Sequence, residues 1–358
     1  MAEIDKYFKE LLLLTKQKYA SDLHLSVGSP PYIRVDGEIF PLALPALAFG
    51  DCKRMIYSIM SPQQIEIFER DKVIDFSFGA RDLGRYRINV YSQRNSIATA
   101  IRAVSDVIPT MEELGLDSEV VKSLCARAKG MILVAGATGS GKSTTLAAMV
   151  DYINKTRKCH ILTIEDPIEY IHKNINSLIH QRELSIDTMS FSDATKYALR
   201  EDPDVILIGE LRDLDTINAA MVLAETGQRV LSTLHTGDAT ESIQRMINIF
   251  DAGRQQQVII QLSFTLIGVL NQLLLPRCDT SGRVLATEIL LMTPALKNAI
   301  RERKFETIYS NIQMGAQYGM KTMNQSLFEL VSQGMITKDL ALSNTTRIKE
   351  LSTMLANI

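Results

Sequence analysis

A glycine-rich stretch in the middle of the chain has the residue types and the spacing of a phosphate-binding loop. Residues 136–143 read GATGSGKS, which matches the pattern G-x-x-x-x-G-K-[ST]. The apolar run "MILV" precedes this loop, and the helical pattern "TTLAAMVDYIN" follows it. Backbone N–H groups of such a loop surround phosphate oxygens, and the following helix adds the positive end of its dipole. The stretch therefore predicts a nucleotide site between a strand and a helix.

Two side chains of this loop are expected to act on the nucleotide in addition to the backbone N–H groups. Lys142 is expected to neutralise the β- and γ-phosphates, and Ser143 to ligate Mg²⁺. The residues expected to contact the nucleotide are Gly136, Thr138, Gly139, Ser140, Gly141, Lys142, Ser143 and Thr144.

Three further apolar runs end in residues that could act on a bound phosphate. "TIEDPIE" contains Glu165, "VILIGE" ends at Glu210, and "STLHT" contains His235. Ligands of an open parallel sheet lie outside the carboxyl ends of its strands. We therefore expect Glu210 to polarise the attacking water, Glu165 to assist through magnesium or its waters, and His235 to bond to the γ-phosphate. Each residue alone could be a solvated carboxylate or a core histidine, and the repeated register favours catalysis.

Phosphoryl transfer also needs a mobile positive charge, which a neighbouring subunit often supplies. Arg85 and Arg87 alternate with apolar Tyr86 and Ile88, so both point to one face of a predicted strand, which could also be a solvated face. This placement suggests a ring in which each subunit interface completes a site. The candidates in the first part of the chain are Arg81, Arg85, Arg87, Arg94 and Arg102.

Length and composition indicate a folded protein of two domains. The chain has 358 residues, of which 46% are hydrophobic and 22% charged. With 39 Lys and Arg against 41 Asp and Glu, a surface that binds polyanions throughout is disfavoured. The four cysteines include no C-x-x-C pair, so neither a zinc site nor a disulfide framework is expected, and a reducing compartment fits. No apolar run is long enough to span a membrane.

The predicted elements divide the chain near residue 103. Residues 1–102 are expected to form an α+β domain, with an amphipathic first helix, hairpin turns at 28–31 and 36–37, a helix near 62–71 and three later strands. Residues 103–113 are expected to be a linker. From residue 114, strand-length apolar runs separated by helical patterns predict a parallel, doubly wound sheet. After residue 240 the chain is expected to be almost wholly helical.

With these motifs in hand, the chain resembles the type IV pilus retraction ATPases, the PilT/PilU family of the secretion ATPase superfamily. The resemblance covers nearly the full length. It lies in "SDLHL" near the start, "GATGSGKSTTLAAM", the acidic box "TIEDPIEYIH", "ALREDPDVILIGELRD", "STLHT" and the C-terminal "GMKTMNQSLFELVSQGMIT". "ALKNAIRERK" resembles a further C-terminal motif of the family, from which Lys297 and Ala299 depart.

The resemblance implies a PAS-like N-terminal domain, a RecA-like ATPase domain with C-terminal helices, and a homohexameric ring that binds ATP and Mg²⁺. It implies ATP-driven domain rotation, transmitted to an inner-membrane platform protein at the cytoplasmic face, without membrane insertion and without nucleic acid. A paralogous retraction ATPase is another implied partner. Carried over, Glu210 is the catalytic glutamate, and Glu165 and His235 line its site. The inter-domain arginines of the family align best with Arg87, Arg94 and Arg102.

Three other functions are compatible with the same motifs. The first is a pilus-assembly or secretion ATPase, although the four-cysteine zinc insert and longer N-terminal extension common in those proteins are not found here, which favours retraction. The second is an accessory ring that binds nucleotide but acts by docking on another motor. The third is a DNA-translocating ring, which the near-neutral charge disfavours.

Overall fold

The computed structural model describes residues 4–35, 37–80, 83–104 and 107–356, and it divides the chain into two compact units. The first unit comprises residues 1–106 with 169–171, and the second comprises 107–168 and 172–358. The predicted turn at 36–37, the candidate Arg81 and part of the predicted linker include positions outside the described residues. The exact limits proposed for the domains stay a prediction.

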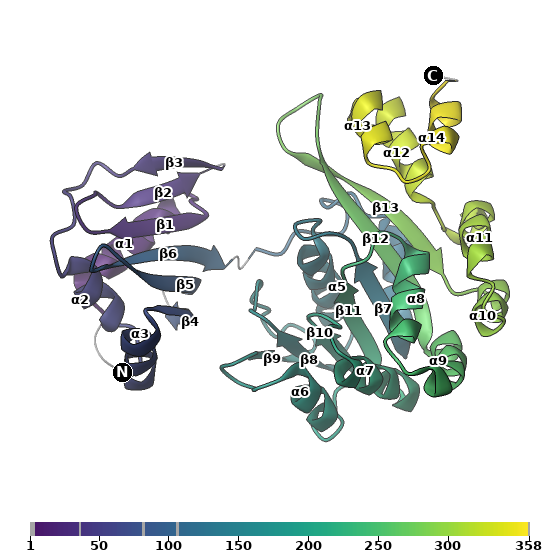
Figure 1. Ribbon diagram of the computed structural model, residues 1–358, viewed down its shortest axis with the longest axis horizontal. Helices are drawn as coiled ribbons and strands as arrows, with labels where there is room; N and C mark the ends of the chain where they lie inside the picture. The colour runs from purple at the N-terminus through teal and green to yellow at the C-terminus, as the bar shows by residue number, and fades with distance from the viewer. Residues whose placement is uncertain (1–3, 36, 81–82, 105–106, 357–358) are drawn as a thin grey trace. The chain divides into compact units, whose positions relative to one another are not determined.

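The first unit is an antiparallel sheet packed against helices (Figure 1). The predicted first helix is confirmed as α1, whose apolar face is buried at Phe8, Leu11 and Leu12. Its N-cap Asp5 accepts a hydrogen bond from the backbone N–H of Phe8. The strand order is β3-β2-β1-β6-β5-β4. The bounds are α1 (Lys6–Gln17), β1 (Asp22–Ser26), β2 (Tyr32–Val35), β3 (Glu38–Pro41), α2 (Asp51–Tyr57), α3 (Pro62–Asp71), β4 (Val73–Ala80), β5 (Gly84–Gln93) and β6 (Ser96–Val104).

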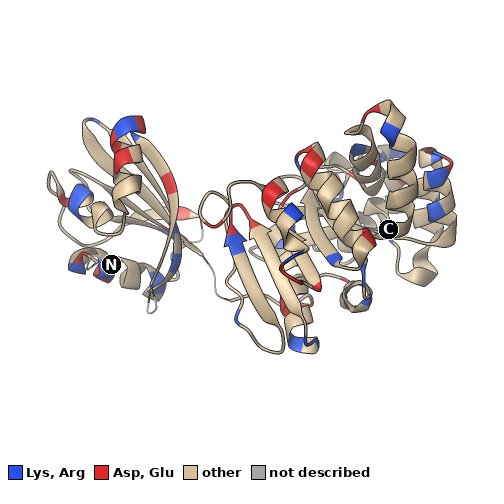
Figure 2. Cartoon of the chain, turned by 90° about the horizontal axis from the view of Figure 1, so that it is seen from below, with Lys and Arg blue, Asp and Glu red and all other residues tan. Residues whose placement is uncertain are grey.

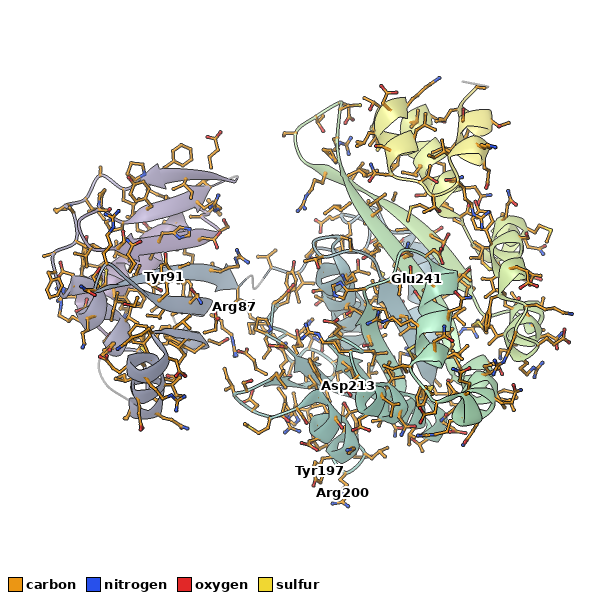
Figure 3. All side chains as sticks on the ribbon, in the orientation of Figure 1. Arg87, Tyr91, Tyr197, Arg200, Asp213 and Glu241 are labelled. Atoms are coloured by element: carbon orange, nitrogen blue, oxygen red, sulfur yellow. The ribbon has the colours of Figure 1, made fainter. Side chains whose placement is uncertain are left out.

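Three candidate arginines align best with the inter-domain arginines of the family. The structure brings two of them together and separates the third. Arg87 on β5, which is labelled in Figure 3, is directly opposite Arg102 on β6, and both residues are exposed. Arg102 donates from Nε to Oδ1 of Asp22 at 2.9 Å, which offsets the repulsion between the two arginines. Arg94 lies in the tight turn at the other end of the β5–β6 hairpin, with φ of 48°. Arg87 and Arg102 thus form one charged site, and Arg94 does not belong to it.

The second unit contains a seven-stranded sheet, in the order β13-β12-β7-β11-β10-β8-β9. The four predicted strands are present as β7, β8, β10 and β11, and all their pairings with one another are parallel. Their residues are almost entirely buried, as expected for strands covered on both faces. The strand bounds are β7 (Gly130–Ala135), β8 (His160–Glu165), β9 (Leu178–Glu183), β10 (Val205–Ile208), β11 (Arg229–Leu234), β12 (Leu266–Pro276) and β13 (Arg283–Leu291).

The expectation of an almost wholly helical chain after residue 240 is wrong. β12 extends the sheet in parallel beside β7, and β13 returns antiparallel to β12 (Figure 1). The run "LIGVLNQLLL" is rich in leucine, which favours helices in isolation, but pairing with the buried edge of β7 overrides that propensity. Gly282, with φ of 104°, lies in the turn before β13, and a glycine there is typical of a β-hairpin. The sheet is therefore mixed, not purely parallel.

Helices cover the mixed sheet and form the C-terminal region (Figure 1). Lys and Arg are interspersed with Asp and Glu along both units (Figure 2), in keeping with the net charge of −2. Among the described residues, no helix is both long enough and apolar enough to cross a lipid bilayer. The α-helix bounds are α4 (Ser118–Ala126), α5 (Lys142–Thr156), α6 (Phe191–Ala198), α7 (Leu214–Thr226), α8 (Ala239–Asn248), α9 (Ala252–Thr265), α10 (Pro294–Arg301), α11 (Ile308–Met314), α12 (Met323–Ser332), α13 (Lys338–Ser343) and α14 (Ile348–Leu355).

Candidate nucleotide-binding and hydrolysis site

The glycine-rich loop connects the C-terminal end of β7 to the first turn of α5. Lys142 is the first residue of α5, and its side chain folds back over the loop. Its Nζ donates to the carbonyl oxygens of Gly136 at 2.8 Å and Ala137 at 2.9 Å. The hydroxyl of Ser140 is buried without a hydrogen-bond partner among the described residues. The loop therefore places a cation and a buried hydroxyl at a helix N-terminus, an arrangement suited to phosphate.

Gly136 is the glycine of this loop with the strictest steric requirement. Its φ is 140°, and a Cβ would lie 2.4 Å from the backbone oxygen of Gln272 and 2.6 Å from Oγ of Ser140. Gly139 also has a positive φ, of 80°, but a Cβ there would meet nothing within 4 Å. The close approach of the loop to β12 therefore depends on the absence of a side chain at Gly136.

We expect Gly136→Ala to destabilise the protein more than the matched control Gly139→Ala. The control adds only left-handed strain, about 1–2 kcal/mol, whereas Gly136→Ala adds a clash with backbone that cannot rotate away. Urea unfolding of both variants measures the difference. Equal losses of unfolding free energy would contradict the requirement for a glycine at position 136.

Glu165 occupies the C-terminal end of β8, two strands away from the histidine-bearing strand. Its Oε1 accepts hydrogen bonds from Oγ1 of Thr163 at 2.6 Å and from Nε2 of Gln181 at 3.1 Å. Gln181 lies on β9, an edge strand that the sequence pattern did not predict because its residues are mostly polar. These two donors fix the position of the carboxylate at the strand end.

Glu210 and His235 follow neighbouring strands and lie close together. Glu210 comes two residues after β10, and His235 directly follows β11. Their side chains approach to 3.5 Å between Oε1 of Glu210 and Nε2 of His235. Thr233 Oγ1 donates to the carbonyl of Gly209 at 2.6 Å, which holds the two strand ends together. The glutamate is mostly buried, with 18% of its side chain exposed, whereas the histidine is more open.

Arg212 is a residue of this site that the sequence analysis missed. Its Nε donates to Oε2 of Glu210 at 2.7 Å, and its Nη1 lies 4.0 Å from Oδ2 of Asp166. The side chain is 60% exposed, so it can swing toward or away from the carboxylate. The signal in the sequence was its position two residues after Glu210, at the end of the same apolar run.

The structure thus brings the predicted residues of the second unit to one edge of the sheet. The strands that carry them are adjacent in the order β7-β11-β10-β8. The exposed hydroxyl of Ser143 in the first turn of α5 and the carboxylate of Glu165 offer hard oxygen ligands, the kind that Mg²⁺ prefers. When bound, magnesium would offset the charge of the transferred phosphate.

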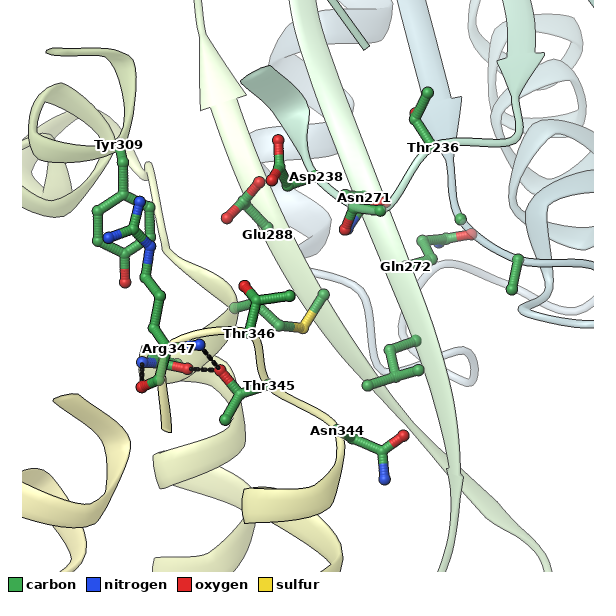
Figure 4. A pocket seen from close by; sticks show the side chains of 16 residues that line it. Thr236, Asp238, Asn271, Gln272, Glu288, Tyr309, Asn344, Thr345, Thr346 and Arg347 are labelled. Carbon is green, nitrogen blue, oxygen red and sulfur yellow. Dashed lines mark hydrogen bonds between the residues drawn. The ribbon is translucent and has the colours of Figure 1, made fainter. Parts of the chain in front are cut away.

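A pocket of about 180 Å³ adjoins the beginning of the loop (Figure 4). Gly136 and Ala137 line one side of it, and the segment 344–347 before α14 lines another. The acceptor oxygens of Asn271 and Gln272 are buried there without a partner among the described residues. Tyr309 stacks on the guanidinium of Arg347, 3.6 Å from the ring centroid. The pocket therefore adjoins the loop at which the phosphates are expected to bind.

A phosphate-binding loop, a strand-end carboxylate next to a histidine, and a mixed sheet whose central strands are parallel in this order define a P-loop ATPase. The sequence profile of the family described as "Type II/IV secretion system protein" matches residues 2–351. The chain belongs to this family.

Within this family, the chain is similar to the pilus ATPases PilT and PilU. The type IV pilus retraction ATPase PilT of Pseudomonas aeruginosa is 46% identical over 330 residues, 92% of this chain and 95% of that protein. The type IV pilus ATPase PilU of the same organism is 38% identical over 348 residues, 97% and 91% of the two chains. A crystal structure of the pilus retraction motor PilT with bound ADP superposes with a TM-score of 0.91, at 46% identity, covering 98% of this chain and 100% of that one. The predicted fold class and the family resemblance are confirmed.

Proposed function

We propose that this protein is a homohexameric motor that hydrolyses ATP with Mg²⁺ and powers the retraction of type IV pili. Two observations support the proposal. Lys142, Glu165, Glu210 and His235 follow adjacent strands at one edge of the sheet, and the relatives PilT and PilU, which match over nearly the whole chain, are pilus ATPases. The proposal that the protein hydrolyses ATP depends on the first observation, that these four residues lie at the same edge of the sheet.

Within this proposal, each residue has a distinct part in the reaction. Lys142 and the loop N–H groups hold the β- and γ-phosphates. Glu210 accepts a proton from the attacking water, after Arg212 has released its carboxylate. His235 contacts the γ-phosphate. Glu165 would help to hold Mg²⁺, directly or through water. The ribose and base occupy the pocket beside the loop.

The ring and its partners complete the proposal. ATP-driven rotation of the two domains would act on an inner-membrane platform protein at the cytoplasmic face, with a paralogous retraction ATPase as a further partner. The paired Arg87 and Arg102 are the better candidates for charge supplied to a neighbouring subunit, because they share one strand face. Arg94, at the far turn, would act separately.

The proposal is tested by counting surface pili on cells that carry Glu210→Gln in place of the native protein. Excess pili that no longer shorten are the expected result, because the ring would assemble and bind ATP without turning over. Cells without pili would instead identify an assembly ATPase. An unchanged count would identify an accessory ring or a motor of another secretion system.

A further inference from the structure

Both oxygens of the Glu210 carboxylate face a nitrogen-bearing side chain. Oε2 accepts a hydrogen bond from Nε of Arg212 at 2.7 Å, and Oε1 lies 3.5 Å from Nε2 of His235. The bond from the guanidinium joins two charged groups, which makes it the stronger kind of hydrogen bond. The proton of an attacking water and the guanidinium of Arg212 therefore compete for the same carboxylate.

The backbone that carries Glu210 and Arg212 is fixed, so only a side chain can end this competition. Thr233 bonds to this segment on both sides of Glu210: its Oγ1 donates to the carbonyl of Gly209 at 2.6 Å, and its own carbonyl accepts from the N–H of Leu211 at 3.2 Å. The side chain of Leu211 is buried, and that of Glu210 is mostly buried. Arg212 is the exposed member of the pair, and its long side chain is free to rotate into solvent.

A second carboxylate lies within reach of the same guanidinium. Asp166 directly follows β8, the strand that pairs with β10. Its Oδ2 is 4.0 Å from Nη1 of Arg212, which is about 1 Å too long for a hydrogen bond. The side chain of Asp166 is 40% exposed, so a small rotation of Arg212 can bring the two groups together. Arginine has five N–H donors, which allows it to bind either carboxylate in turn.

We propose that Arg212 is a positioning residue that exchanges between Glu210 and Asp166 and thereby sets how often Glu210 is free to act as the base. The inference rests on the proposed ATPase function. While Nε of Arg212 is bonded to Oε2, the carboxylate is occupied. When the guanidinium pairs with Asp166, the carboxylate is free to accept the proton of the water. The turnover rate is then reduced in proportion to the occupied fraction, as for any protein whose competent state is only partly populated.

The first measurement is steady-state ATP hydrolysis by the full-length protein. We expect Arg212→Ala to raise kcat roughly two- to fivefold, the factor that an exposed ion pair can supply. The KM for ATP should stay within about twofold, since the phosphate-binding loop is untouched. Arg212→Lys keeps the positive charge and should stay closer to the wild type. A fall of kcat in Arg212→Ala would overturn the proposal, because the guanidinium would then assist the reaction itself.

The matched control for the loss of an arginine is Arg200→Ala. Arg200 lies in the segment that leads into β10, at the opposite end of that strand from Glu210, and its guanidinium contacts the ring of Tyr197 (Figure 3). This variant should hydrolyse ATP at the wild-type rate. An equal rise of kcat in both variants would also overturn the proposal, because it would not depend on the contact with Glu210.

The second measurement tests the exchange through Asp166→Asn in two backgrounds. In the wild type, removal of this charge leaves the guanidinium on Glu210, and kcat should fall roughly twofold. In Arg212→Ala there is no guanidinium to redistribute, so Asp166→Asn should leave kcat at the level of Arg212→Ala alone. The same fall in both backgrounds would show that Asp166 acts independently of Arg212, which contradicts the exchange.

Urea unfolding of the nucleotide-free proteins tests the contact without hydrolysis. Glu210→Gln should lower the unfolding midpoint in the wild type, because the charge-assisted bond is lost. In Arg212→Ala the same substitution should raise the midpoint, because it removes a mostly buried charge that has lost its cation. Identical shifts in both backgrounds would overturn the proposal. A wild-type protein without ATPase activity would refute the proposed function, while the midpoints would still decide whether Arg212 holds Glu210.

Discussion

Replacing Glu210 by glutamine is expected to lower the turnover of ATP by roughly 10²–10⁴-fold, the usual contribution of a general base. Glutamine keeps the shape of the side chain but cannot accept a proton from the attacking water. ATP binding should be unaffected, because the phosphates are held by the loop after β7 and not by the end of β10. Phosphate release measures the turnover, and titration with a fluorescent nucleotide measures the binding.

The matched control for this substitution is Glu225→Gln. Glu225 lies near the C-terminal end of α7, the helix that follows Glu210, and its carboxylate accepts a hydrogen bond from Gln261 on the surface. This control should turn over ATP like the wild type. If Glu210→Gln also kept most of its activity, another carboxylate would have to activate the water, and Glu165 at the end of β8 would be the next to examine.

Replacing Lys142 by alanine is expected to lower kcat by roughly 10²–10³-fold, comparable to the loss of one preorganised donor to a developing anion. It should also weaken ATP binding, because the ammonium group is the cation at the loop. In the structure this group is held by the carbonyl oxygens of Gly136 and Ala137, so it is already directed over the loop. Phosphate release and nucleotide titration measure the two effects.

Lys155→Ala is the control for the loss of a positive charge from α5. Lys155 lies in the last turn of the same helix, where its Nζ pairs with Asp151 at 2.6 Å, away from the phosphate-binding loop. Its removal should leave hydrolysis unchanged. Hydrolysis by Lys142→Ala at the wild-type rate would refute the assignment of residues 136–143 as the nucleotide site, and with it the proposed motor function.

Several parts of the fold could be predicted because their signals are local. The apolar runs of β7, β10 and β11 are buried along their whole length, so they read as strands without any knowledge of their neighbours. The positions of Glu210 and His235 followed from the same local pattern, since each comes just after such a run. Their proximity required one further rule, that parallel strands end at the same edge of a sheet.

Other parts could not be predicted because they depend on long-range pairing. β12 is rich in leucine and becomes a strand only because the edge of β7 is free to pair with it. β9 is mostly polar and becomes a strand beside β8, where its Gln181 reaches Glu165. The same holds for Glu288, whose hydrogen bond from Ala239 joins residues 49 positions apart in the sequence.

The sequence by itself therefore determined the chemistry of this protein: which residues can bind phosphate, which can accept a proton, and which strands carry them. The tertiary structure decided which partners surround these residues. It set Arg212 against Glu210, separated Arg94 from the pair Arg87 and Arg102, and joined Glu288 to the start of α8. The reason is physical, because motifs depend on local spacing, whereas side-chain partners depend on which distant segments the buried strands bring into contact.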